Sequence, residues 1–312
     1  MSKHNKTLIL TIYGDYHRRV PYYIGLVNYL KLINKRLNVL IVVSSTECFF
    51  SGKLKYRKTK NYETFGIDKM DLKTTDKVYN FYKKIPHNKI IICPNKGWDI
   101  GPLYVGLNYM YMHSDIPEYI INIHSKTNVE WERSLTKISH YNASDFNVDT
   151  IVPARWNSPV YTADNISSKL NIDKILTLKD IIIGPDYSNI KNWDYIGGKM
   201  FITKTEYLKP IVESFDTIYP MLTDSRTDDK FWVDAVSNEK IFNYYYNLYK
   251  YNPWNEPINH KAFHARVHLK CKNYFELLNH GYRSIPDLMI EHALERIIGH
   301  LILNNSDRIL DV

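Results

Sequence analysis

The first 125 residues alternate apolar β-type runs with helical segments, and this alternation restricts the fold more than any other feature. Continuous runs rich in β-branched residues predict buried strands at residues 7–13, 38–44, 89–93 and 119–123. Helices are predicted between them, at residues 20–32, 76–84 and 102–113. Pro102 fits the first turn of the last of these helices. Alternating strands and helices indicate an α/β fold whose largely parallel sheet has helices on both faces.

The pattern is less regular after about residue 130. Further strands are predicted at residues 150–154 and 195–203, and further helices at residues 205–215, 230–251 and 287–303. The last helix has the clearest apolar stripe of the second half. A boundary near residue 235 would separate an α/β part, residues 1–235, from a mainly helical C-terminal subdomain, residues 236–312, packed on the sheet.

Charge and cysteine content limit the compartment and the partners. Lys and Arg number 41 and Asp and Glu 33, and the formal charge of +8 suits anionic partners. The basic run from Lys53 to Lys60 is interpreted as a solvated loop. Three cysteines without CxxC spacing indicate a reducing compartment. The N-terminal apolar run is short for a signal peptide, and no apolar run reaches ~18 residues, so we expect a cytoplasmic protein.

Ligands of parallel α/β sheets bind at the carboxyl ends of the strands, so the residues after each predicted strand are the candidates for a site. Tyr13 ends the first strand. The third is followed by Asn95-Lys-Gly97-Trp-Asp99-Ile-Gly-Pro102, a tight turn with a carboxylate before a helix. Such a turn can hold the hydroxyls of a ribose or a sugar, or it can be a plain turn in which Asp99 caps the helix.

A cationic pair follows the fourth strand. Side chains alternate along a strand, so His124 and Lys126 of the sequence His-Ser-Lys point to the same face. Two cationic groups at the mouth of a sheet suit a diphosphate, although lysine is also common where a strand meets solvent. Gly197 and Gly198, followed by Lys-Met200-Phe, allow a ligand or another chain to approach the backbone closely, or they form a bulge.

Four carboxylates are candidates for a general base. Glu291 and Glu295 are four residues apart and share one face of the last helix. Asp228 and Asp229 lie in a predicted loop, which can equally be an ordinary acidic, solvated loop. The helix lacks the HExxH zinc signature, so a metalloprotease is not expected.

Taken in order, four of these motifs resemble the rhamnan synthesis protein F family of glycosyltransferases, a relative of the GT-A enzymes of glycosyltransferase family 2. The motifs span roughly residues 88–300 and are Asn95 to Pro102, Ile123 to Lys126 followed by Trp131 and Arg133, Gly197 to Phe201, and His292 to Arg296. The resemblance implies a GT-A-like, Rossmann-like fold with a nucleotide-sugar-binding and acceptor-binding domain at residues 1–235.

The resemblance also implies an activity. The donor would be a nucleotide-diphosphate sugar, with rhamnose as one possibility, and the acceptor a glycan or lipid-linked oligosaccharide, with possible peripheral contact to a membrane. Tyr13, Asn95, Gly97, Asp99, His124 and Lys126 would bind the donor, and Gly197, Gly198 and Met200 the acceptor. Transfer would invert the anomeric centre with one carboxylate as base, and the loop position favours Asp228 or Asp229 over Glu291 and Glu295.

The sequence departs from the GT-A pattern at one place. Typical GT-A enzymes carry Asp-x-Asp after the fourth strand to hold Mg²⁺ or Mn²⁺ on the diphosphate, and this chain has His124-Ser125-Lys126 there. Lys126 and His124 are therefore expected to supply part of the positive charge, and the need for a metal stays open.

Three other classes of function remain open. The alternative closest to the transferase is a non-catalytic glycan-binding protein with a degenerate GT-A fold. A nucleic-acid partner is not expected, because the sequence has no RNA-binding signature and no zinc-finger spacing. A histidine-dependent hydrolase would need a paired nucleophile and base, which no motif supplies.

Overall fold

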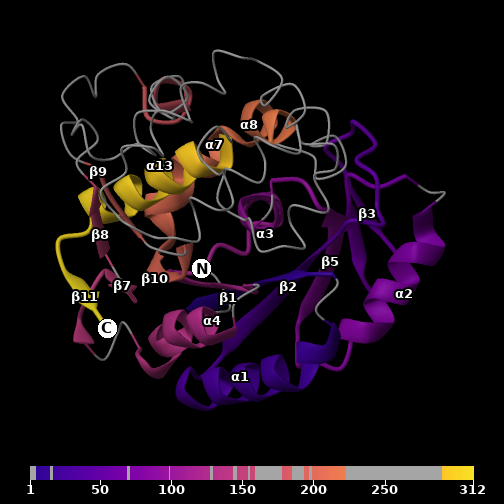
Figure 1. Ribbon diagram of the computed structural model, residues 1–312, viewed down its shortest axis with the longest axis horizontal. Coiled ribbons are helices and arrows are strands. Elements are labelled where there is room, and N and C mark those ends of the chain that lie inside the picture. Colours follow the sequence, from indigo (N-terminus) through magenta and orange to yellow (C-terminus); the bar gives the residue numbers. More distant parts are fainter. Residues whose placement is uncertain are drawn as a thin grey trace, which may run out of the picture.

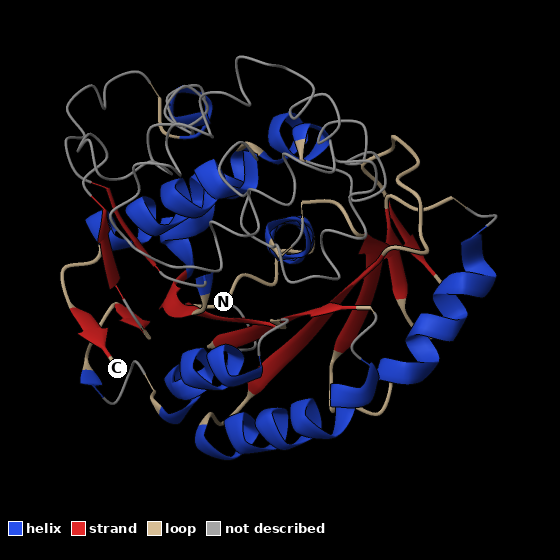
Figure 2. Ribbon diagram, viewed as in Figure 1, coloured by secondary structure: helices blue, strands red, loops and turns tan. Residues whose placement is uncertain are grey.

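The computed structural model of the chain describes residues 5–14, 17–68, 71–97, 99–126, 129–142, 146–153, 155–158, 178–184, 193–196, 199–222 and 290–312. These residues form one nine-stranded sheet, in the order β11-β7-β10-β6-β1-β2-β5-β4-β3, with helices on both faces (Figure 1 and Figure 2). The predicted α/β fold with a mostly parallel sheet is confirmed.

Four parallel strands make up the centre of the sheet. They are β1 (Lys6–Tyr13), β2 (Leu37–Ser45), β5 (Lys89–Pro94) and β6 (Tyr119–His124). Strand β1 pairs with β2 on one side and with β6 on the other, and β2 pairs with β5. Their side chains are buried on both faces, as the continuous apolar runs predict for parallel strands under two helical layers.

Shorter strands extend both edges. On one side lie β10 (Phe201–Lys204), antiparallel to β6, then β7 (Thr150–Val152) and β11 (Ile309–Asp311). On the other side lie β4 (Glu63–Phe65) and β3 (Tyr56–Lys58). Part of the basic run predicted to be a loop thus forms the edge strand β3, and the exposed Lys58 on this short strand discourages further pairing.

The single strand predicted at residues 195–203 is wrong. Its ends belong to two strands in different sheets, β9 (Trp193–Ile196) and β10. Strand β9 pairs with β8 (Arg155–Ser158) in a separate two-stranded sheet, and β10 joins the main sheet. The two glycines between them interrupt the apolar run, and glycine weakens the interior of a strand.

One layer of helices covers the lower face of the sheet in Figure 1. It consists of α1 (Val20–Ile33) with the short η1 (His17–Arg19) before it, α2 (Leu72–Tyr82), and α4 (Val129–Leu135) with η3 (Thr136–His140) after it. These helices bury apolar side chains against β1, β2 and β6, among them Tyr23, Val27 and Leu30 of α1. The predicted helix at 20–32 is confirmed.

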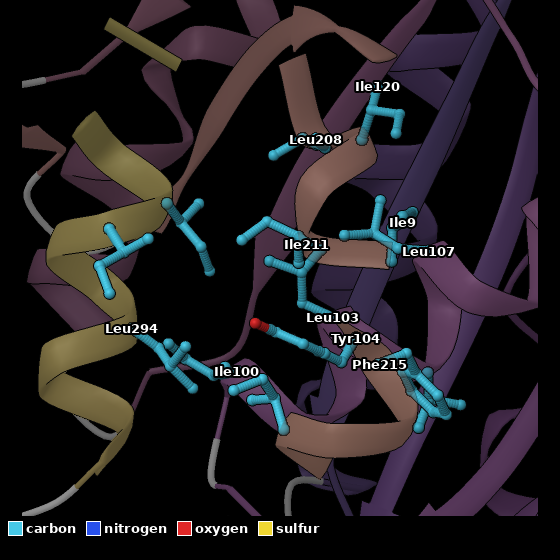
Figure 3. Packing of buried hydrophobic residues seen from close by; sticks show 14 of the residues in the cluster. Ile9, Ile100, Leu103, Tyr104, Leu107, Ile120, Leu208, Ile211, Phe215 and Leu294 are labelled. Atoms are coloured by element: carbon cyan, nitrogen blue, oxygen red, sulfur yellow. The ribbon is translucent and has the colours of Figure 1, made fainter. Parts of the chain in front are cut away.

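The opposite layer is built around α3 (Ile100–Met112), which lies between the sheet and further helices. These are η5 (Thr205–Leu208), α7 (Lys209–Glu213), α8 (Phe215–Met221) and α13 (Ile290–Asn305). Figure 3 shows Tyr104 and Ile100 of α3 among Ile211, Phe215 and Leu294. The helix predicted at 205–215 is broken into three pieces, because Pro210 starts a new helix and Ser214 separates α7 from α8.

The described C-terminal residues attach firmly to the sheet. The carboxylate of Asp149, just before β7, accepts hydrogen bonds from the backbone N–H groups of Asp307 and Arg308 and pairs with Lys204 at 2.7 Å. Strand β11 follows directly and pairs with β7. Most of the predicted helical subdomain, including the helix predicted at 230–251, lies outside the described residues, so the boundary at residue 235 stays a prediction.

None of the helices that the structure describes is long and apolar enough to cross a bilayer.

Two glycines with opposite surroundings test how tightly the loop before α3 is packed. A Cβ on Gly101 would lie 1.7 Å from the carbonyl oxygen of Lys96, whereas a Cβ on Gly25 of α1 would meet nothing within 4 Å. We expect Gly101→Ala to lower the free energy of unfolding by about 1 to 3 kcal/mol through overpacking. Gly25→Ala should raise it by roughly 0.5 to 1 kcal/mol. Urea unfolding followed by circular dichroism measures both, and equal effects would contradict the packing described.

Candidate functional site

The order of the central strands locates the candidate site. From β1 the chain moves to β2 and β5 on one side and then returns to β6 on the other, so the direction of strand addition reverses between β1 and β6. Open α/β sheets bind ligands at the carboxyl ends of the strands beside such a reversal. In this chain Tyr13 and His124 lie at those two strand ends.

An ionic cluster lies at this place. The carboxylate of Asp99, from the loop between β5 and α3, is 3.0 Å from Nζ of Lys126 and 3.3 Å from Nδ1 of His124. Its other oxygen, Oδ1, is 2.7 Å from Nζ of Lys199, which precedes β10. Strand β10 runs antiparallel to β6, so its amino end lies beside the carboxyl end of β6. Three segments far apart in the sequence thus supply one charged site.

The loop between β5 and α3 is fixed by its glycines. Gly97 has φ +71°, a left-handed conformation that glycine adopts without steric cost. Its carbonyl accepts hydrogen bonds from the N–H groups of Ile100 and Gly101 at 2.9 and 3.0 Å. Gly101 lets the loop fold back onto Lys96, whose ammonium donates to the carbonyl of Leu222. The glycine spacing of this motif therefore sets the position of Asp99 at the start of α3.

Lys199 has an unusual backbone for its type. Its φ is +56°, a left-handed value that costs a non-glycine residue about 1 kcal/mol or more. The Nδ2 group of Asn122 on β6 donates to the carbonyl of Lys199 at 2.6 Å and helps to hold this conformation. Strained residues held by their surroundings are concentrated at functional sites. The strained backbone directs the Lys199 ammonium to Asp99.

The backbone of Lys126 is held by a buried charge pair. Glu132 of α4 accepts a hydrogen bond from the Lys126 N–H at 3.2 Å and another from the Tyr23 hydroxyl at 3.0 Å. Arg19 pairs with Glu132 at 2.5 Å and also donates to the Lys126 carbonyl. Ser125 adds two bonds to β1, one between its Oγ and the Tyr13 N–H at 2.9 Å and one from its N–H to the Thr11 carbonyl. These bonds keep the segment after β6 rigid.

The cluster keeps its charges in spite of burial. Burial by itself would raise the pKa of Asp99, but the positive charges of Lys126 and Lys199 hold that pKa well below its ordinary value. Burial would likewise lower the pKa of Lys199, and the carboxylates of Asp99 and Glu295 instead raise it above its ordinary value. The Asp99 carboxylate and the Lys199 ammonium group therefore both stay charged at neutral pH.

The members of the cluster differ in access to solvent. The side chain of Asp99 is 20% exposed and that of Lys126 is 12% exposed, whereas the side chain of His124 is only 1% exposed. The side chain of Lys199 is 9% exposed. Asp99 and Lys126 are therefore the members most accessible to a ligand, and Lys199 is accessible over a small part of its side chain. His124 is too buried for direct contact.

Helix α13 brings carboxylates to the other side of Lys199. Oε2 of Glu295 is 3.8 Å from the Lys199 ammonium, and the Glu295 side chain is 13% exposed. Glu291, one turn earlier, is almost fully buried. Glu295 is therefore the carboxylate of this helix that borders both the cluster and solvent.

The described residues at this site do not fit a divalent cation. No group of three or more His, Cys, Asp and Glu side chains in the described part of the chain could hold a metal ion. Both oxygens of Asp99 already face ammonium groups, and a divalent cation beside Lys126 and Lys199 would meet two like charges within a few ångströms. The described donors are ammonium groups paired with carboxylates rather than the set of free oxygen ligands that a divalent cation needs.

The structure brings some of the predicted site residues together and places others elsewhere. The structure brings together Asp99, His124, Lys126 and Glu295, and places Tyr13, Asn95 and Gly97 at neighbouring strand ends or in the adjoining loop. Met200 is fully buried in the core. Gly197, Gly198, Asp228 and Asp229 lie outside the described residues.

Sequence reasoning assigned no role to Lys199, Arg19 or Glu132. Lys199 lies inside the Gly-Gly-Lys-Met motif, and this motif is the sequence feature that could have identified it as a site residue. Glu132 and Arg19 are 113 residues apart, and nothing in the sequence connects them.

Comparison with known proteins gives a distant likeness of fold. No family model and no curated protein matches the chain, so the resemblance to the rhamnan synthesis protein F family stays a prediction. One similar solved structure is the mannosyltransferase Ktr4p from S. cerevisiae, at 7% identity and a TM-score of 0.31, with 70% of this chain and 60% of that chain covered.

Another is core-mannan synthase A (CmsA/Ktr4) from Aspergillus fumigatus in its Mn/GDP form, at 8% identity and a TM-score of 0.29, with 70% of this chain and 64% of that chain covered. The chain thus spans less than two thirds of the length of these two proteins. At such scores nothing about its substrate follows from the likeness.

The buried Glu132 can be tested against an exposed neighbour. Glu132→Gln removes the charge that Arg19 faces and weakens three hydrogen bonds, so we expect the free energy of unfolding to fall by about 2 to 4 kcal/mol. Glu130→Gln changes an exposed carboxylate of the same helix and should stay within about 0.5 kcal/mol of the original chain. Denaturant titration measures both, and two equally small effects would rule out the buried pair as a structural support.

Proposed function

We propose that this chain is a glycosyltransferase that moves a sugar from a nucleotide-diphosphate donor to a glycan or polysaccharide acceptor. One observation carries the proposal, namely the cluster of Asp99, Lys126, Lys199 and His124 at the sheet edge where α/β folds bind nucleotides. The motifs that supply these residues are the same ones that carry the resemblance to a glycosyltransferase family.

The two lysines account for diphosphate binding. An ammonium group has three N–H donors and can bind a carboxylate and a phosphate oxygen at the same time. In the proposed complex Lys126 and Lys199 contact the diphosphate, while Asp99 keeps both ammonium groups in place and accepts hydrogen bonds from hydroxyl groups of the ribose or sugar.

The chemistry requires charge stabilisation and one proton acceptor. The acceptor hydroxyl attacks the anomeric carbon, the bond from that carbon to the diphosphate oxygen breaks, and a carboxylate takes the hydroxyl proton. Negative charge grows on the departing diphosphate during this step. Ammonium groups fixed before the reaction stabilise that charge without having to reorganise.

The proposed mechanism uses these lysines in place of a divalent metal. The supporting observation is the donor set, in which the described residues offer ammonium groups where Asp-x-Asp enzymes offer carboxylates. Mg²⁺ and Mn²⁺ favour carboxylate oxygens as ligands, and both oxygens of Asp99 already face lysine ammonium groups.

Glu295 is the base that we propose for an inverting reaction. It is partly exposed and lies beside Lys199, so an acceptor next to the diphosphate would be within its reach. Glu291 is almost fully buried and less suited to meet an acceptor. The sequence favoured Asp228 or Asp229 instead, and these two remain competing candidates.

The donor sugar is proposed only as a class. Rhamnose is one possibility, through the family resemblance, and the acceptor is a glycan or a lipid-linked oligosaccharide. A non-catalytic glycan-binding protein would keep the fold, but the charged cluster would have no role in it. Transfer or hydrolysis of a nucleotide sugar separates the two functions.

Binding of nucleotide sugars tests the proposal directly. A thermal-shift screen should find a nucleotide-diphosphate sugar that raises the melting temperature, because a ligand that binds the native state stabilises it. Lys126→Ala and Lys199→Ala should each weaken binding by about ten- to a hundredfold, since each loses a charged hydrogen bond worth about 1.5 to 3 kcal/mol. Isothermal titration calorimetry measures the affinities.

Lys209→Ala is the matched control, because Lys209 is exposed on α7 and pairs with Glu213, one turn later on the same helix, at 3.3 Å. Binding should persist in excess chelator. The proposal fails if no nucleotide-diphosphate sugar binds, or if Lys126→Ala binds as well as Lys209→Ala. Binding and turnover that vanish in chelator and return with Mn²⁺ or Mg²⁺ would refute the metal-free mechanism.

Three variants identify the base. Glu295→Gln should lower kcat by about 10² to 10⁴ while donor binding is largely kept, because a general base contributes that much to the rate. Asp228→Asn and Asp229→Asn should keep turnover near that of the original chain. Steady-state kinetics with the donor found in the thermal screen measures all three. If Glu295→Gln stays active and one aspartate variant loses most of its turnover, that aspartate is the general base instead.

A further inference from the structure

One helical layer of the described structure carries a large excess of positive charge. Residues 17–36, 71–84 and 129–140, which form α1, α2, α4 and their short extensions, contain eleven lysines and arginines against four aspartates and glutamates. Their balance of +7 compares with a formal charge of +8 for the whole chain. Figure 1 shows these helices together on one side of the sheet.

The opposite layer has the opposite sign. Residues 100–112, 205–221 and 290–305, which form α3, η5, α7, α8 and α13, contain two lysines and arginines against five aspartates and glutamates. Among the described helices, one layer therefore carries an excess of cations and the other an excess of anions. Such an asymmetry orients a protein in front of a charged surface.

The cationic layer also exposes apolar side chains. Five of the eleven exposed large hydrophobic residues in the described part of the chain belong to it, namely Tyr29, Leu32, Leu72, Phe81 and Val129. Leu32 is 78% exposed, the most of any of them. A surface that combines exposed apolar residues with an excess of cations is typical of proteins that touch lipid.

Helix α1 is the centre of this surface. Its outward positions are Pro21, Gly25, Asn28, Tyr29 and Leu32, and none of them is charged. Cations bracket the helix, with Arg18 exposed before it and Lys35 and Arg36 exposed after it. An uncharged outer face between basic ends matches a helix lying in the interface of a membrane, with apolar side chains among the acyl chains and cations among the headgroups.

We propose that the layer of α1, α2, α4 and η3 binds the surface of a lipid bilayer that contains anionic lipids, with α1 in contact with it. A second copy of the chain fits less well, because a symmetric dimer would place two faces of charge +7 against each other. Nucleic acid would satisfy the cations but would offer no apolar partner to Leu32, the most exposed of the layer's large apolar residues.

The test uses the full chain and lipid vesicles of two compositions. The protein should co-sediment with vesicles of equal parts phosphatidylcholine and phosphatidylglycerol, and much less with vesicles of phosphatidylcholine alone. Added salt should release it, because exposed charges are screened. Leu32→Glu should weaken binding to the anionic vesicles by about tenfold or more, as an apolar contact is lost and a negative charge is added.

Met112→Glu is the matched control. Met112 is 64% exposed at the end of α3, in the other layer, so the same change there should leave vesicle binding unaltered. The proposal is overturned if the original chain ignores anionic vesicles at low salt, or if Leu32→Glu binds them as well as Met112→Glu. Sedimentation showing a dimer that Leu32→Glu dissociates, without vesicle binding, would assign the face to a second copy instead.

Discussion

The ion pairs of Asp99 are the interactions on which the candidate site depends. One carboxylate holds two ammonium groups at 3.0 and 2.7 Å, and these groups come from the ends of β6 and β10 while Asp99 comes from the loop after β5. Burial of any one of these charges alone would be costly, so each requires the others. The fold meets this requirement through strand order, because the return of the chain from β5 to β6, followed by antiparallel β10, brings the three segments to one edge.

The sequence predicts the centre of the fold better than its periphery. Strands β1, β2, β5 and β6 consist of long β-branched runs buried on both faces, so composition alone identifies them. The three-residue strands β3, β4 and β11 lack such a signal, because they are set by pairing with a neighbour rather than by their own pattern. The broken run at 195–203 shows the same limit, since local hydrophobicity does not reveal to which sheet a strand belongs.

The residues of the candidate site show the same difference between what the sequence predicts and what depends on strand pairing. Asp99, His124 and Lys126 could be predicted because each directly follows a recognisable strand and parallel strands end at one edge. Lys199 could not be assigned, since it depends on β10 running antiparallel to β6 and on a left-handed backbone at that residue. Glu132 and Arg19 act on Lys126 through its backbone, and a contact of that kind leaves no residue-type pattern in the sequence.

A site of fixed lysines and a metal site acquire their positive charge at different times. A metal ion enters after folding, whereas Lys126 and Lys199 are placed by the fold, with Glu132 and Asn122 holding their backbones. Two neighbouring ammonium groups need an anion close by, and Asp99 lies between Lys126 and Lys199 in the structure. In the proposed function, the carboxylate that pairs with both ammonium groups also keeps them close enough together to contact one diphosphate, and this double role accounts for its position between them.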